Sequence, residues 1–90
     1  MLKRGRVDIY ADILEAVSRH GGASITKIAY ASGLPLDRMR KLLNILISYG
    51  LIKEIQGERP KFTITRRGLE FLDAYRKMKV FLTILSGRAT

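Results

Sequence analysis

Apolar residues in the first half of the chain recur at spacings of three and four, which is the period of an amphipathic helix. This pattern predicts helices over residues 7–20, 25–31 and about 35–49. Glycines follow each of these segments, and Ser24 and Pro35 are residue types favoured at a helix start. Three helices joined by short turns therefore come before any predicted strand.

After Gly50 the pattern changes to the alternation that is typical of β-strands. The segment LIKEIQGERPKFTIT, residues 51–65, places apolar and polar side chains alternately on both sides of a GERP tip, which predicts a β-hairpin. Thr65 is suited to cap a fourth helix that begins at Arg66 and meets no stop signal before Ser86-Gly87. The predicted fold class is mainly α with a small β-hairpin (α+β), ending in a long helix.

Three helices, a hairpin and a long helix follow one another as in a winged helix-turn-helix. The segment ITKIAYASGLPLDRMRKLLNILISYGLIKEIQGERPKFTITRRGLEFL resembles that family. Its small-residue turn leads to the recognition helix, YGLI leads into the first wing strand, and TRRGLEFL matches the opening of the last helix. Over roughly residues 6–85 the chain most resembles the small archaeal DNA-binding proteins of the Sso ten-a type.

That resemblance implies two winged domains joined through their long C-terminal helices in an antiparallel coil. It also implies that the recognition helix enters the major groove of double-stranded DNA while the wing lies on the backbone. The expected organisation is a basic N-terminal arm over residues 1–6, a winged-helix domain over 7–70 and a coiled-coil dimerisation helix over 71–86.

Charge and composition narrow the class of partner. The 17 Lys and Arg against 8 Asp and Glu give a formal charge of +9, which favours a polyanion, nucleic acid before acidic membrane. No cysteine is present, so disulfides and thiolate metal sites are excluded. The basic start lacks the apolar core of a signal peptide, and no run approaches the about eighteen apolar residues of a membrane span. We expect a cytoplasmic, nucleoid-associated protein without a membrane partner.

Polar side chains form a stripe on the predicted third helix, opposite its apolar side. On a solvated helix the stripe would have no further role, but in a winged helix it would face the major groove, where Arg can pair with guanine and Asn with adenine. Arg38 lies at the edge of the apolar arc and suits a phosphate or a partner acid. Asp37 is explained more simply by the helix dipole. The predicted recognition-helix contacts are Asp37, Arg38, Arg40, Lys41, Asn44 and Ser48.

Cations elsewhere in the chain are predicted to contact phosphates. Arg59 and Lys61 lie at the hairpin tip, where the alternative is ordinary solvation. Arg66 and Arg67 fall in the first turn of the last helix and oppose its dipole, which suggests an external anion. At the N-terminus, an arm along the backbone or in a minor groove is as reasonable as a tail without function; it contains Lys3, Arg4 and Arg6.

The predicted last helix has two apolar sides. Leu69 and Leu72 lie on one side and are expected to pack on the winged domain. The other side is a heptad seam, whose contiguous apolar surface predicts a homodimer rather than a monomer. A membrane-surface helix is the weaker alternative, because the segment is short. The predicted dimerisation residues are Phe71, Tyr75, Met78, Leu82 and Leu85.

No constellation in the sequence points to an enzyme. His20 is the only histidine and lies beside glycines, where a solvent-exposed imidazole is ordinary. Asp8, Asp12 and Glu15 form a stripe on the first helix, but no further oxygens converge on it, so we expect a solvated face and no metal. We therefore predict a dimeric double-stranded DNA-binding protein without cofactors or catalytic residues, either a regulator or a chromatin-type architectural protein. The alternative is a winged helix used as a protein–protein interaction module.

Overall fold

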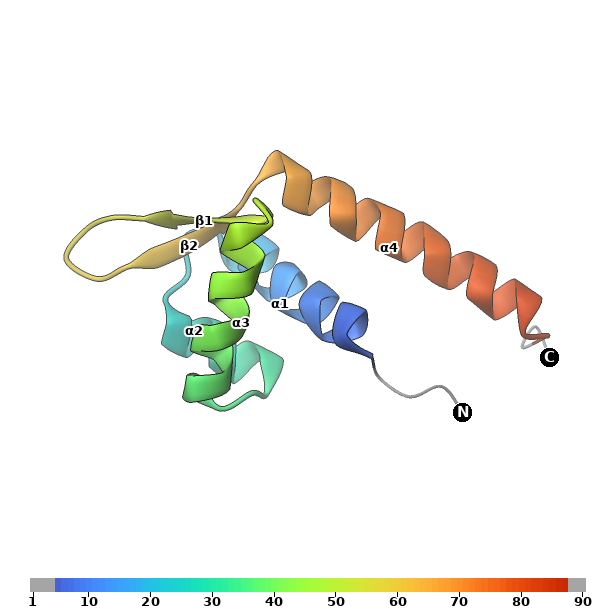
Figure 1. Ribbon diagram of the computed structural model, residues 1–90, viewed down its shortest axis with the longest axis horizontal. Helices are drawn as coiled ribbons and strands as arrows, with labels where there is room; N and C mark the ends of the chain where they lie inside the picture. Colours follow the sequence, from blue (N-terminus) through green and yellow to red (C-terminus); the bar gives the residue numbers. More distant parts are fainter. Residues whose placement is uncertain (1–4, 88–90) are drawn as a thin grey trace.

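Residues 5–87 form four helices and a two-stranded hairpin, which are arranged as in Figure 1. The computed structural model of the protein describes residues 5–87. Its elements confirm the predicted mainly α (α+β) winged-helix fold with a long final helix, and the predicted ends hold to within one or two residues. They are α1 (Arg6–His20), α2 (Ile25–Ser32), α3 (Leu36–Ser48), β1 (Ile52–Ile55), β2 (Lys61–Ile64) and α4 (Arg66–Leu85).

The turn between α2 and α3 depends on one glycine. Gly33 has a φ of 68°, the left-handed conformation that a residue without Cβ adopts at no steric cost. Its N–H donates to the carbonyl oxygens of Ala29 and Tyr30, so the turn follows α2 without an intervening loop. At the other end of α2, the hydroxyl of Ser24 accepts a hydrogen bond from the backbone N–H of Lys27 at 3.3 Å. Both ends of this helix are therefore fixed locally.

The hairpin pairs β1 and β2 antiparallel, with Ile52 opposite Ile64. A short third piece of sheet joins it, because Ala23 exchanges two backbone hydrogen bonds with Phe62, at 2.8 and 3.1 Å. This bridge could not be predicted from the sequence, since a single residue between Gly22 and Ser24 has no period to detect. The bridge ties the start of α2 to the wing.

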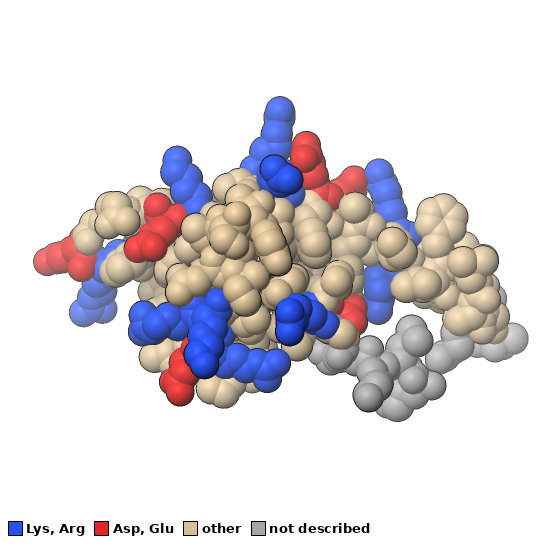
Figure 2. Space-filling view, in the orientation of Figure 1, with Lys and Arg blue, Asp and Glu red and all other residues tan. Residues whose placement is uncertain are grey.

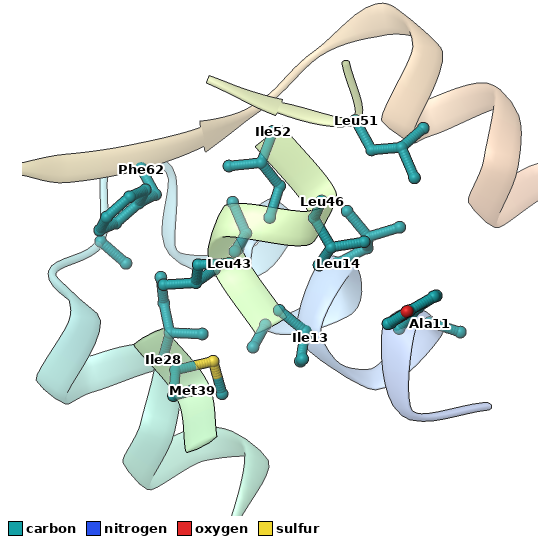
Figure 3. Packing of buried hydrophobic residues seen from close by; sticks show 14 of the residues in the cluster. Ala11, Ile13, Leu14, Ile28, Met39, Leu43, Leu46, Leu51, Ile52 and Phe62 are labelled. Atoms are coloured by element: carbon teal, nitrogen blue, oxygen red, sulfur yellow. The ribbon is translucent and has the colours of Figure 1, made fainter. Parts of the chain in front are cut away.

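The core forms where α1, α2, α3 and the hairpin converge (Figure 3). Met39, Leu43 and Leu46 of α3 are 0–1% exposed, and they pack among residues of the other elements. Burying each such side chain contributes about 1.5–3 kcal/mol. Because α3 is held by its apolar side, its polar side must point outward. The partners of α3 in this core include Ile13, Leu14, Ile28, Leu51, Ile52 and Phe62.

Helix α4 runs antiparallel to α1 and then continues past it (Figure 1). Leu72 is 2% exposed, as predicted, and Phe71 and Tyr75 are partly buried against the core. The prediction for Leu69 is wrong, because it is 50% exposed. Gly68 occupies the position next to the domain instead, so the face of α4 that packs is rotated from the expected one. No helix within residues 5–87 is long and apolar enough to cross a membrane.

The junction between the wing and α4 is unusually close. The hydroxyl of Thr65 donates to the carbonyl oxygen of Gly50 at 2.6 Å and accepts from the N–H of Gly68 at 3.1 Å. A Cβ built on Gly68 would lie 2.2 Å from the carbonyl oxygen of Leu51 and 2.6 Å from Cγ1 of Ile64. Only glycine allows α4 to approach the base of the wing at this distance.

Replacing Gly68 with alanine tests this contact. Alanine normally stabilises a helix relative to glycine by about 0.5–1 kcal/mol, but here the added methyl group meets backbone. We expect Gly68→Ala to lower the free energy of unfolding by about 3 kcal/mol and Tm by roughly 10–20 °C.

Glu70→Ala is the matched control, because Glu70 is exposed in the same turn of α4. Thermal unfolding followed by circular dichroism measures both variants. A Gly68→Ala protein as stable as the wild type would show that α4 does not approach the wing this closely.

Candidate nucleic-acid interface

The outer side of α3 is a polar ridge that follows directly from how the helix is packed. Its predicted contact residues are all exposed, whereas Met39, Leu43 and Leu46 face the core. Figure 2 shows Lys and Arg side chains gathered over the surface that α3 occupies in Figure 1. The hydroxyl of Ser48 donates to the carbonyl oxygen of Ile45 at 2.6 Å. Its donor is therefore used within the helix, which leaves Ser48 as an acceptor.

Between α3 and the hairpin lies a groove of about 270 Å³, here called the wing-side groove. Arg40 and Asn44 of α3 line it together with Pro60 at the hairpin tip, so the structure brings the predicted base-reading residues next to the wing. Glu54 of β1 also lines it and is half-buried. The place of this carboxylate could not be predicted from the sequence, because alternation in a short strand indicates only that a side chain is polar, not which groove it faces.

The opposite side of α3 carries a second groove, the α1-side groove, which is lined by Arg38, Lys41 and the first turn of α1. Arg6 is the first residue of α1, so the prediction that it belongs to a basic arm is wrong. The cause is local, since the backbone N–H of Gly5 donates to the carboxylate of Asp8 at 2.9 Å and starts the helix one residue early. Lys3 and Arg4 lie outside the described residues.

Further cations border the same region. Arg59 and Lys61 are exposed at the hairpin tip, and Arg66 and Arg67 are exposed in the first turn of α4. A Cβ built on Gly50 would lie 3.6 Å from Cδ of Arg67. Arg67 therefore lies beside the C-terminal end of α3, whereas Arg38, Arg40 and Lys41 lie in its first half.

Among residues 5–87, ion pairs involve only four of the basic side chains. Glu15 pairs with Arg76 at 2.6 Å and with Arg19 at 3.8 Å. On α4, Lys77 pairs with Asp73 at 3.0 Å, and Lys79 lies 3.9 Å from Asp8. All of these pairs belong to α1 and α4. Within residues 5–87, no cation of α3, the hairpin or the first turn of α4 has an acidic partner within 4.0 Å.

The arrangement of these elements matches a known family. The model of the winged helix-turn-helix family matches residues 3–82, nearly the whole chain. The chain belongs to the winged helix-turn-helix family. In the terms of this family, α2 and α3 form the helix-turn-helix, α3 is the recognition helix, and the β1–β2 hairpin is the wing.

Several solved structures share this winged helix-turn-helix fold. Sso10a-2, a DNA-binding protein from Sulfolobus solfataricus, superposes with a TM-score of 0.78 and 23% identity over 94% of this chain and 90% of its own. A MarR family transcription regulator, SP03579, superposes with a TM-score of 0.78 and 20% sequence identity over 91% of this chain. MepR, a transcription regulator of the Staphylococcus aureus multidrug efflux pump MepA, superposes with a TM-score of 0.77 and 18% sequence identity over 92% of this chain.

The two regulators are longer than this winged helix-turn-helix chain, which covers 57% of SP03579 and 65% of MepR. No curated protein sequence matches it. At these identities the likeness shows the fold.

The carboxylates of α1 are used inside this winged helix-turn-helix protein, so the prediction of a solvated face is wrong for Asp8 and Glu15. Asp8 accepts a hydrogen bond from the hydroxyl of Tyr75 on α4, and Glu15 accepts one from Arg76 at 2.6 Å. Helix periodicity places acids on one side but cannot show that a basic helix later covers that side. Within residues 5–87, no group of three His, Cys, Asp or Glu side chains is placed to hold a metal ion.

The predicted heptad seam splits into two parts on this winged helix-turn-helix scaffold. Phe71 and Tyr75 are half-buried against the core, whereas Met78, Leu82 and Leu85 are 59%, 42% and 78% exposed. Further large apolar side chains are exposed around the same end of α4; they are Val80, Phe81 and Ile84. Because α4 continues past α1, no described residue of the same chain covers this end.

Removing the Tyr75 hydroxyl tests the polar contact between α1 and α4. A hydrogen bond to a charged acceptor contributes about 1.5–3 kcal/mol, and partial exposure of this one reduces the value. We expect Tyr75→Phe to lower the free energy of unfolding by about 1 kcal/mol, or Tm by roughly 5 °C.

Tyr49→Phe is the matched control, since Tyr49 is 57% exposed at the end of α3. Chemical denaturation of both variants gives the comparison. An equal loss of unfolding free energy in Tyr75→Phe and Tyr49→Phe would mean that the contact to Asp8 adds nothing to stability.

Proposed function

We propose that the protein binds double-stranded DNA as a homodimer, with α3 in the major groove and the wing on the backbone. The observation that carries the proposal is the division of charge described above. Arg19 of α1 and the cations of α4 from Arg76 to Lys79 pair with acids of the same chain, while the cations of α3, the wing and the start of α4 have no such partner among the described residues. A polyanion would supply the missing counter-charge.

The recognition helix offers both kinds of contact that duplex DNA requires. Arg40 and Asn44 carry side chains that can pair bidentately with guanine and with adenine at the floor of the major groove. Lys41 carries a charge that suits a phosphate. Arg40 and Asn44 line the groove beside the wing, so a base contact and a backbone contact can form together.

Arg66 and Arg67 support the same orientation of the DNA. A cation in the first turn of a helix opposes the helix dipole, at a cost of about 0.3–1 kcal/mol. The amino end of α4 lies beside the end of α3, where a phosphate would contact both the exposed cations and the helix terminus. Arg59 and Lys61 on the wing are proposed to contact the backbone in the same way.

A second copy of the chain is the proposed partner of the exposed end of α4. The seam residues Met78, Leu82 and Leu85 follow a heptad spacing, and isolated apolar surface of this extent is unusual on a soluble monomer. Dimerisation would place two recognition helices on one duplex, and linked sites gain from effective concentration. In this proposal residues 7–70 form the DNA-binding unit and residues 71–86 the dimerisation helix.

The role of such a dimer is proposed to be transcriptional regulation or the architectural coating of chromosomal DNA in the cytoplasm. MepR is named a transcription regulator and Sso10a-2 a DNA-binding protein, and both share this fold. The proposed activity is binding alone, without a cofactor or catalysis.

Replacing Arg40 and Lys41 together with alanine tests the recognition helix. Each substitution removes a charge-assisted contact, so we expect duplex affinity to fall by about 100-fold, or roughly 3 kcal/mol. Folding should be unaffected, because both side chains are exposed. Fluorescence anisotropy with a labelled duplex at fixed salt gives the affinity.

Arg19→Ala with Lys77→Ala is the matched control, which removes the same net charge from the paired group. It should change affinity less than fivefold. Equal losses in the two double variants would mean that only net charge matters and that α3 has no special place at the interface.

Charging the seam tests the dimer. Leu82→Glu puts a carboxylate where it would have to be desolvated against the partner helix, so we expect the dimer to dissociate at micromolar concentration. Thr83→Glu adds the same charge one residue away, off the seam, and should leave the dimer intact. Sedimentation velocity decides between them, and a wild-type chain that sediments as a 10.2 kDa monomer would contradict the proposed assembly.

A further inference from the structure

The two grooves beside α3 lie on opposite flanks of one ridge. At about 100° per residue, Arg38 and Ile45 lie on one flank, and Arg40 and Asn44 lie on the other, about 100–160° away. Lys41 projects from the ridge between them. The wing-side groove already has a place in the proposed function, whereas the α1-side groove has none.

The shape of duplex DNA places a sugar–phosphate backbone beside each flank of a helix that lies in the major groove. An α-helix with its side chains is about 10–12 Å across, and the major groove is about 12 Å wide, so a helix that enters the groove fills it. When its ridge meets the bases, each flank faces one of the two sugar–phosphate backbones. The wing serves one backbone, and the α1-side groove faces the other.

The lining of the α1-side groove suits such a backbone. Its volume is about 570 Å³, and Arg6, Arg38 and Lys41 surround it. No hydrogen bond or ion pair among residues 5–87 uses these three side chains. The floor is formed by half-buried aliphatic side chains, Ile9, Leu42 and Ile45. Cations beside an apolar floor match the charged phosphates and the apolar sugar edges of a DNA strand.

Arg6 is held in position for this role. The capping contact between the N–H of Gly5 and Asp8, and the backbone bond from the N–H of Ile9 to the carbonyl oxygen of Gly5 at 3.2 Å, fix the first turn of α1. A cation in that turn opposes the helix dipole, as it does at Arg66.

We propose that the α1-side groove binds the DNA backbone that lies across the recognition helix from the wing, with Arg6, Arg38 and Lys41 as its phosphate contacts. The inference rests on the proposed function and extends the interface to α1, an element outside the helix-turn-helix. In this arrangement both flanks of α3 contact a DNA backbone. Arg6 contacts its phosphate from a helix and not from an extended arm.

The test is the salt dependence of duplex binding by the full chain carrying Arg6→Gln. One lost phosphate contact lowers the slope of log K against log salt by roughly 0.9. We expect that change, with an affinity loss of about five- to tenfold at low salt and an equal loss on duplexes of different sequence. Arg6→Lys should restore the slope, because it restores the charge.

Arg19→Gln is the matched control, since it removes one Arg charge from the other end of α1, away from the groove. It should keep the wild-type slope. An Arg6→Gln slope equal to that of the wild type would overturn the inference.

Failure of this inference is distinguishable from failure of the proposed function. If Arg40→Ala, which changes only the wing-side groove, loses duplex affinity while Arg6→Gln does not, α3 binds DNA and the α1-side groove does not. If neither variant differs from the wild type, both are wrong.

Discussion

The approach of α4 to the base of the wing at Gly68 is the constraint on which the arrangement of the molecule depends. A side chain there would lie 2.2 Å from the carbonyl oxygen of Leu51, so α4 can begin where it does only with glycine. Thr65 stabilises the same junction, since its hydroxyl donates to the carbonyl oxygen of Gly50 at the end of α3 and accepts from the N–H of Gly68 in α4. The direction of α4 relative to the recognition helix is thereby fixed within four residues.

That direction determines how charge is distributed. Once α4 lies along α1, its basic residues meet the carboxylates of α1, and Asp8 and Glu15 are used in holding two helices together. Three acids, Asp37, Glu54 and Glu58, belong to α3 and the wing, and none of them forms an ion pair with a described cation. The basic surface thus consists of the cations that form no ion pair within the chain. The exposed ion pairs of α1 and α4 each contribute little to stability. Their larger effect in this account is to define which face is left for DNA.

Much of this architecture could be predicted from local patterns, and most of what could not depends on contacts between distant segments. Helix periods, the caps Ser24 and Thr65 and the hairpin tip are encoded within a few residues, so their predictions are confirmed. Glu15 was misplaced because its partner comes from the distant α4, and Leu69 because the approach of Gly68 to the wing turns another face of α4 toward the domain. Arg6 was misplaced for a local reason, since the apolar period does not detect the capping of Gly5 by Asp8. The α1-side groove was not predicted, since it joins the first turn of α1 to the flank of α3.

The most direct test of the central claim is a titration of the ¹⁵N-labelled protein with a short duplex, followed by amide chemical shifts. The account predicts that shifts concentrate on α3, the wing, the first turn of α4 and the first turn of α1. Amides of residues 73–77, whose acidic and basic side chains pair within the chain, should stay unchanged at moderate salt. Shifts confined to the exposed end of α4, or spread evenly over every basic residue, would contradict it.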